Sequence, residues 1–369
     1  MSTGGCEECG ASIGCLSLSS AKACHKCEKV LCSNCASSFP LIPFKNAKNE
    51  NEDGEEDDEA NDLSKHNTIC SFCKKCFQEE SVLDFSKTFD VVEPTSTTKT
   101  DPIHGTSSTT TVGISNNKTN SAMTFVFVHG GGASRAMYVP YARLLAERGH
   151  RSILLDLPGH GTLADTPLTL DSCSSTVQKI LDEDSTLTKD NTIYVGGSFG
   201  AYTGFYTLDK LKDRFAGAVL IDCGQGVGPG CSFKARFGLV FLRMLSKNMS
   251  NMGLMGAMKG VSEKSPADWK LIESTFGAGN FFDQGAEQVD CLHTVDPAEH
   301  IPNLKFPIIF FNGSEDHRDS EEKWLSLCHD KERSYLKVYE GGDHFFSHDS
   351  RFVSDLTDRL DKFAKDLSH

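Results

Sequence analysis

The chain has 369 residues, which predicts one large domain or two unequal domains, and its 38% hydrophobic and 24% charged residues exclude a disordered chain, a collagen and a coiled coil. The net charge of −14 argues against a nucleic-acid partner. No apolar run of about 18 residues occurs, and the first residues lack the basic and apolar regions of a signal peptide, so we expect a cytoplasmic protein.

Residues 1–78 are rich in cysteine. In a chain without a secretory signal, regularly paired cysteines indicate metal ligands before disulfides. Four Cys-x-x-Cys pairs occur, and eight thiolates predict two structural zinc ions with four ligands each. The predicted ligands are Cys6, Cys9, Cys24, Cys27, Cys32, Cys35, Cys73 and Cys76. Cys70 competes with Cys76 as the partner of Cys73. A segment this small would gain much of its folding free energy from the metal.

The cysteine spacing resembles that of a FYVE-type zinc finger, because the third pair follows the second after four residues, within 24–35. The resemblance implies a cross-brace, with pairs one and three on one zinc ion and pairs two and four on the other. That family binds phosphatidylinositol 3-phosphate through a basic cluster at the second pair. Here the matching stretch, 21–27, has one histidine and no arginine, and an acidic insert at about 46–66 would repel anionic lipid. Two partners therefore stay open: a phosphoinositide on an endosomal membrane, or a protein.

Residues 79–120 form a Ser/Thr-rich stretch with the composition of a linker. Two short β-prone runs within it, 88–92 and 109–114, are candidate leading strands of the next domain.

Residues 121–369 alternate between strand-like and helix-like stretches. Continuous apolar runs predict buried parallel strands at 124–128, 152–155, 192–195, 217–221 and 307–311. Helix patterns include 138–148 and a final segment with one apolar face, made by Phe352, Leu356, Leu360, Phe363 and Leu367. This alternation predicts the α/β class, a mostly parallel sheet with helices on both faces. Residues 224–302 predict an insertion that forms a helical cap.

A Gly-x-Ser-x-Gly motif, 196–200, follows one apolar strand and precedes a helix-like stretch. That context is typical of a nucleophile elbow, in which Ser198 occupies a sharp turn with small neighbours. The glycines of 129–134 follow another strand, where they let a backbone N–H approach a developing oxyanion. We expect the N–H groups of Gly131 and Phe199 to be the two donors.

With a third strand-end motif at 156–161, the region resembles the α/β-hydrolase superfamily, and in particular its lipase, esterase and monoacylglycerol-lipase-like branch. The resemblance implies the chain order serine, acid, histidine. Asp316 matches the acid and His344 matches the base. It further implies a serine hydrolase that cleaves a carboxylic ester, such as a monoacylglycerol, with no cofactor needed for catalysis.

Other residues compete for these roles. Glu315, Asp319 and Asp222 are rival acids, although carboxylates at such positions are more often surface or capping groups. We expect His348 on a solvated face of the final helix. His129 and His160 precede the elbow, so we expect them to brace their loops by hydrogen bonding.

Two alternatives to ester hydrolysis are a non-catalytic docking protein with a hydrolase fold and an acyltransferase. Five of the eight methionines lie in 224–302, which is consistent with an acyl-chain pocket and with ordinary packing of cap helices.

Overall fold

The computed structural model describes residues 22–23, 30–31, 37–41, 68–72, 87–94, 123–229, 285–316 and 320–368, the first four ranges by their backbone alone. These four are strands in two small antiparallel sheets. The strands are β1 (Lys22–Ala23) with β2 (Val30–Leu31), and β3 (Ser37–Leu41) with β4 (Thr68–Phe72). All eight predicted zinc ligands lie outside the described residues, as do the run 109–114 and most of the expected cap.

A sheet of seven strands forms the centre of the larger domain, in the order β11-β10-β9-β8-β6-β7-β5. Its strands are β5 (Phe89–Val92), β6 (Thr124–Val128), β7 (Arg151–Leu155), β8 (Thr192–Gly197), β9 (Gly217–Ile221), β10 (Ile308–Gly313) and β11 (Tyr335–Tyr339). Every neighbouring pair is parallel except β5 with β7. The predicted mostly parallel sheet is confirmed, and β5 confirms the candidate strand at 88–92.

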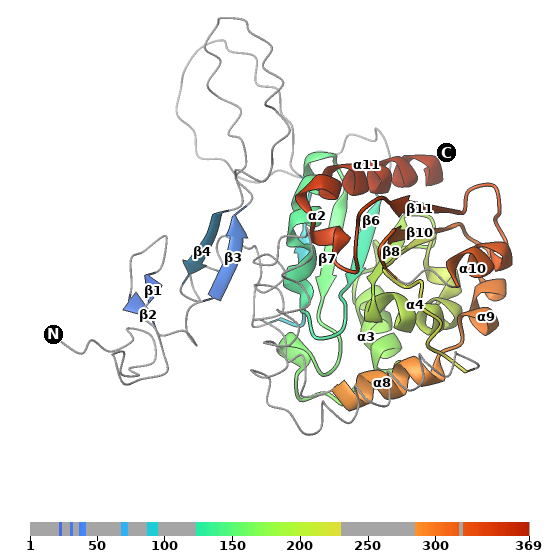
Figure 1. The fold of residues 1–369 in the computed structure, drawn as a ribbon, viewed down its shortest axis with the longest axis horizontal. Helices are drawn as coiled ribbons and strands as arrows, with labels where there is room; N and C mark the ends of the chain where they lie inside the picture. The colour runs from blue at the N-terminus through green and yellow to red at the C-terminus, as the bar shows by residue number, and fades with distance from the viewer. Residues whose placement is uncertain are drawn as a thin grey trace, which may run out of the picture.

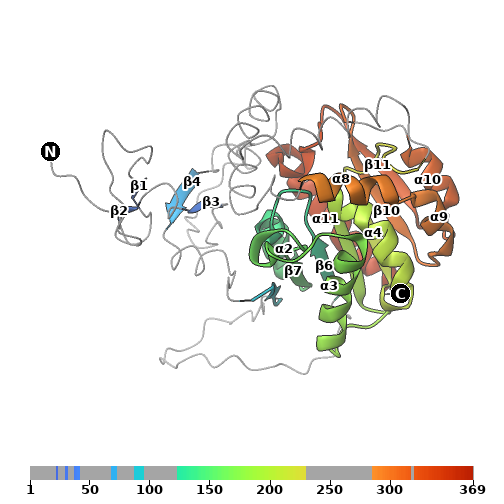
Figure 2. The same cartoon turned by 90° about the horizontal axis from the view of Figure 1, so that it is seen from below.

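Helices cover both faces of this sheet (Figures 1 and 2). The first layer consists of α2 (Val139–Glu147) and α11 (Ser350–Leu367). The second consists of α3 (Leu170–Glu183), α4 (Phe199–Lys210), α8 (Gly285–Thr294), α9 (Pro297–His300) and α10 (Glu321–Leu327). Strand residues alternate between the layers: Phe125 and Phe127 pack in the core with α2 and α11, while Val126 and Val128 pack in the core on the other face.

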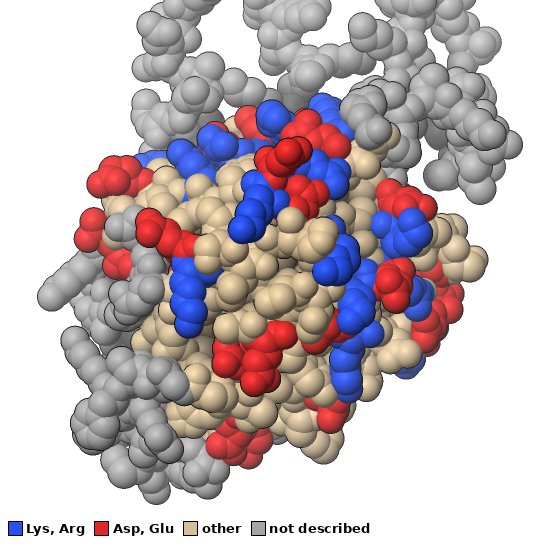
Figure 3. Space-filling model, turned by 90° about the vertical axis from the view of Figure 1, so that its right-hand side faces the viewer, with Lys and Arg blue, Asp and Glu red and all other residues tan. Residues whose placement is uncertain are grey.

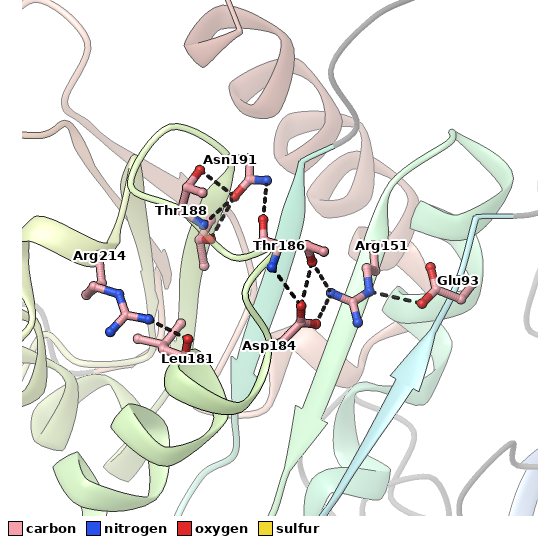
Figure 4. Close-up of polar contacts among 9 residues, drawn as sticks. Glu93, Arg151, Leu181, Asp184, Thr186, Thr188, Asn191 and Arg214 are labelled. Carbon is pink, nitrogen blue, oxygen red and sulfur yellow. Dashed lines mark hydrogen bonds and ion pairs between the residues drawn. The ribbon is translucent and has the colours of Figure 1, made fainter. Parts of the chain in front are cut away.

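Polar contacts link the loops at the amino end of the sheet to one another (Figure 4). Arg151, at the start of β7, pairs with Glu93 after β5 and with Asp184 after α3, at 3.0 and 2.6 Å. Arg214 donates to the carbonyl oxygen of Leu181 in the last turn of α3, where helix carbonyls lack intrahelical partners. These contacts are structural and lie at the end of the sheet opposite to the residues discussed below.

The outer surface carries both signs of charge. On the face in Figure 3, Lys and Arg side chains lie among Asp and Glu side chains, so the described part of this face offers no broad basic surface for nucleic acid. Among the described helices, none has the length and apolar composition needed to cross a membrane.

A buried ion-pair cluster joins β5, β7 and the loop after β6. The Arg135 side chain is 1% exposed; its Nε lies 2.8 Å from Asp90 in β5, and its Nη1 lies 2.8 Å from Asp156 after β7. Asp156 also accepts the backbone N–H of Arg135, at 2.9 Å, and the hydroxyl of Thr162, at 2.9 Å. Because one cation is shared by two buried carboxylates, removal of Arg135 would take the same charge partner from both.

We therefore expect Arg135→Met to lower the free energy of unfolding by about 3–5 kcal/mol, the usual cost of breaking a buried ion pair from one side. Urea unfolding followed by circular dichroism measures this loss. The matched control is Arg148→Met, whose partner Asp358 is 61% exposed and whose loss should stay below about 1 kcal/mol. Equal losses in the two variants would contradict the structural role of Arg135.

Candidate functional site

Ser198 lies on a sharp turn between β8 and α4. Its backbone adopts φ 47° and ψ −114°, an uncommon conformation for a residue other than glycine. The turn is held from both sides: the Ser198 N–H donates to the Ile221 carbonyl at 2.7 Å, and the Ser198 carbonyl accepts from the first turn of α4. A Cβ on Gly200 would lie 2.3 Å from the carbonyl oxygen of Val128, so only glycine lets α4 approach β6 this closely. The predicted strand–turn–helix context is present.

The structure brings Ser198, His344 and Asp316 together from three strand ends. Ser198 Oγ lies 3.0 Å from His344 Nε2, and His344 Nδ1 lies 2.8 Å from Asp316 Oδ2. Asp316 follows β10, and His344 follows β11 in a turn that begins at Gly341. The Asp316 side chain is 8% exposed and that of His344 is 43% exposed, so the imidazole is open to an incoming molecule while its acid partner is shielded.

Opposing effects act on the imidazole of His344. Burial lowers its pKa, whereas the hydrogen bond and charge of Asp316 and the charge of Asp343 raise it, and the net result is a pKa above the ordinary value. The site therefore stabilises the imidazolium relative to an isolated histidine. This is the state that His344 would reach on taking a proton from Ser198.

The rival acids lie in different surroundings. Glu315 is exposed, and Asp319 lies outside the described residues. Asp222 does not fit the surface expectation, because it is 4% exposed. One of its carboxylate oxygens, one of Asp316 and a ring nitrogen of His344 lie within 4.8 Å of one another. The geometry places Asp316 directly on the imidazole and Asp222 beside both.

The expectation for His348 is wrong. The chain makes a 3-10 turn over Phe346–His348 before α11 begins at Ser350, so His348 precedes the helix and is buried at 4% exposure. Burial, followed by the charge of His344, lowers the pKa of His348 to about 4. This histidine stays neutral and does not compete for the role of base.

His129 and His160 brace the loops after β6 and β7, as predicted. His129 Nε2 accepts the N–H of Leu157 at 3.0 Å, and His160 Nε2 accepts the N–H of Gly132 at 3.0 Å. His129 donates its Nδ1–H to the carbonyl of Gly130, and His160 donates its Nδ1–H to the carbonyl of Pro158. Burial lowers the pKa of both, that of His160 to about 3, so both rings are neutral acceptors.

These contacts show which backbone N–H groups of the loop after β6 are already hydrogen-bonded. The N–H of Gly132 is bonded to His160, and that of Ala133 to the Gly130 carbonyl. In the part of the chain that the structure describes, no group accepts from the N–H of Gly131 or Phe199. A Cβ on Gly131 would lie 3.3 Å from the Cβ of Phe199, so the two predicted donors belong to adjoining backbone segments.

Gln288 is a neighbour of this site that no sequence motif marks. It comes from α8, and its Nε2 lies 3.3 Å from His160 Nε2. Its Oε1 would lie 2.3 Å from a Cβ on Gly131, so the amide packs directly on the glycine. The insertion after β9 therefore delivers a polar side chain to the loop that carries one predicted donor.

Three solved structures illustrate the likeness of the fold. A putative non-heme bromoperoxidase from Mycobacterium tuberculosis is 13% identical with a TM-score of 0.56, and the match covers 68% of this chain and 94% of that one. An esterase from Exiguobacterium antarcticum is 18% identical with a TM-score of 0.54, and the match covers 67% of this chain and 93% of that one. A monoacylglycerol lipase from Paleococcus ferrophilus is 15% identical with a TM-score of 0.51, and the match covers 66% of this chain and 94% of that one. At these identities the likeness shows the fold. A comparison with curated protein sequences finds no match. The profile of the Alpha/beta hydrolase family matches residues 125–356, more than half of the chain, and the protein belongs to this family.

Proposed function

We propose that the protein is a serine hydrolase that cleaves a carboxylic ester through an acyl-enzyme on Ser198. The observation that carries this proposal is the hydrogen-bonded chain from Ser198 Oγ through His344 to Asp316, at 3.0 and 2.8 Å. The uncommon turn at Ser198 and the two N–H groups of Gly131 and Phe199 add the other elements that acyl transfer needs.

In the proposed reaction, Ser198 Oγ attacks the ester carbonyl while His344 Nε2 takes the hydroxyl proton. Asp316 accepts the Nδ1–H, which fixes the tautomer and stabilises the imidazolium. The N–H groups of Gly131 and Phe199 bind the oxyanion, each typically worth ~3 kcal/mol of the barrier. The tetrahedral intermediate then collapses, and His344 gives its proton to the leaving alcohol. Water attacks the acyl-enzyme with His344 again as the base, which releases the acid and restores Ser198.

The finer proposal is that the substrate is a lipid ester such as a monoacylglycerol. It is supported by the apolar and methionine-rich composition of 224–302, which would supply an acyl-chain pocket. Helix α8, within the described part of this insertion, lies beside the loop that carries Gly131, here called the oxyanion loop, through Gln288. From this position a cap would cover a bound acyl group.

For the N-terminal segment we propose a cross-braced finger with two zinc ions, which localises the enzyme to a membrane surface or a protein partner. The spacing of the eight cysteines carries this proposal. In the short sheets, Ser37 of β3 pairs with Phe72 of β4, so positions beside the third and fourth cysteine pairs in the chain are neighbours. The cross-brace assigns these two pairs to different ions.

We expect wild-type protein to hydrolyse p-nitrophenyl esters and Ser198→Ala to lose this turnover, because alanine removes the nucleophile and preserves the fold. Initial rates over a series from acetate to palmitate measure both the activity and its chain-length preference. Rates that rise with chain length would support the lipid ester, whereas a short-chain optimum would reject it and retain the hydrolase.

A Ser198→Ala protein that keeps most of the wild-type turnover would refute the assignment of the nucleophile. Thermal unfolding of both proteins is the control for folding. Labelling of wild type, but not of Ser198→Ala, by a fluorophosphonate provides a readout that is independent of the ester chosen. A folded wild-type protein that is neither labelled nor active would favour the docking role.

The proposed base must be neutral to accept the serine proton, so kcat/KM should fall as the pH decreases through the pKa of His344. Since that pKa is raised, the half-maximal rate should lie above pH 6.5. Asp343→Asn removes one of the negative charges that raise it, so the midpoint should move to lower pH. A pH profile of both proteins tests this, and a wild-type midpoint below pH 6.5 would contradict it.

The zinc proposal predicts about two zinc ions per full-length chain by elemental analysis, since four thiolates hold one ion. A Cys24→Ser/Cys27→Ser variant should lose about one ion, and Cys15→Ser is the matched control that should lose none. Cys70→Ser and Cys76→Ser distinguish the competing ligands of the fourth pair. A wild-type content near zero in metal-replete buffer would refute the proposal.

A further inference from the structure

Gln288 reaches the candidate site from α8, in the later part of the insertion after β9. Its helix neighbours Val289 and Cys291 are 1% and 5% exposed and belong to the same apolar core as the buried side chains of α4. Gln288 itself is partly exposed. The packing of α8 on this core fixes where the amide lies, and its partial exposure leaves the amide accessible to a bound molecule.

The orientation of this amide follows from the tautomer of His160. The ring donates its Nδ1–H to the Pro158 carbonyl, so its Nε2 carries a lone pair. That Nε2 accepts the N–H of Gly132 at 3.0 Å, and Nε2 of Gln288 lies 3.3 Å from it. Only the nitrogen of the amide can donate to this lone pair. The amide oxygen of Gln288 is therefore turned away from His160.

This oxygen lies against Gly131. A Cβ at position 131 would be 2.3 Å from Oε1 of Gln288 and 3.3 Å from the Cβ of Phe199. The amide thus takes the space of a side chain at position 131, next to both residues that carry the predicted oxyanion donors. An amide oxygen accepts hydrogen bonds and donates none, so it cannot stabilise the oxyanion. It can accept from a donor group of a substrate bound at these two residues.

We propose that Gln288 is a specificity-determining residue whose amide oxygen accepts a hydrogen bond from a hydroxyl of the ester substrate, close to the reacting carbonyl. This inference rests on the proposed function and adds a polar requirement to the substrate class. A hydroxyl fits better than an ammonium group, because one neutral acceptor does not replace the hydration that a charged group loses. The hydroxyl can belong to the alcohol part, as in a monoacylglycerol, or to the acyl part.

Pairs of esters that differ only in their hydroxyl groups test this. Monohexanoylglycerol and propyl hexanoate differ on the alcohol side, whereas ethyl β-hydroxyhexanoate and ethyl hexanoate differ on the acyl side. For at least one pair, we expect wild type to favour the hydroxylated ester by about tenfold in kcat/KM, the usual worth of one neutral hydrogen bond. Titration of the released acid at constant pH measures these rates. The pair that shows the preference identifies the part of the substrate that carries the hydroxyl.

Gln288→Leu keeps the approximate size of the side chain and removes the acceptor, so the preference should disappear. A general loss of turnover, caused by the lost contact with His160, would affect both esters of a pair equally and leave their ratio unchanged. Glu287→Leu is the matched control, because it introduces the same side chain at the exposed neighbouring position of α8 and should retain the preference.

Gly131→Ala is an independent variant that decides the question if Gln288→Leu does not fold. It keeps the backbone N–H of residue 131, while the added Cβ would displace the amide of Gln288. This variant should therefore lose the preference as well, whatever its overall turnover. Thermal unfolding of each variant is the control for folding.

Equal rates within both pairs for wild type, or ratios that Gln288→Leu leaves unchanged, would overturn the inference and retain the proposed function. If folded wild-type protein hydrolyses none of these esters, the inference is also overturned. Labelling of Ser198 by a fluorophosphonate then separates the two failures: a labelled serine retains the proposed nucleophile, and an unlabelled serine rejects the proposed function.

Discussion

The sharp turn at Ser198 is the constraint on which the other features of the site depend. Its positive φ lifts the hydroxyl above the carboxyl edge of the sheet, and it persists because Ile221 and the first turn of α4 hold its backbone groups. The turn also places α4 against β6, and only a glycine at position 200 leaves room for this close approach. Once this geometry is set, strand order alone brings the ends of β10 and β11 close enough for Asp316 and His344 to complete the hydrogen-bonded chain.

The loop after β6 is rigid for a different reason, which is electrostatic. Two neutral histidines accept backbone N–H groups across the loops, and the buried Arg135 cluster fixes the same loop to β5 and β7. In the proposed function, the N–H groups of Gly131 and Phe199 on these segments would bind the oxyanion, and a loop fixed before substrate enters would favour that role.

The surroundings of His344 differ from the loop after β6, because several carboxyl groups lie near its imidazole. The charges of Asp316 and Asp343 raise the pKa of His344, while burial and then the charges of Asp316, Glu321 and Asp343 raise that of Asp222. The raised pKa of Asp222 means that its surroundings disfavour its charged form. Asp316 contacts the imidazole directly, whereas the buried Asp222 has an oxygen that makes no hydrogen bond within the described residues.

The sequence by itself determined the parallel strands and the elbow at Ser198, because apolar runs and strand-end motifs are local signals, whereas Asp316 and His344 were assigned through the resemblance to the α/β-hydrolase superfamily. It did not place His348 or Asp222, since the exact start of α11 and the depth of a strand end depend on tertiary packing. Gln288 had no signal at all, because its position depends on where the insertion returns over the oxyanion loop. Only the tertiary structure decided these contacts, since burial and charge proximity arise between segments far apart in the chain.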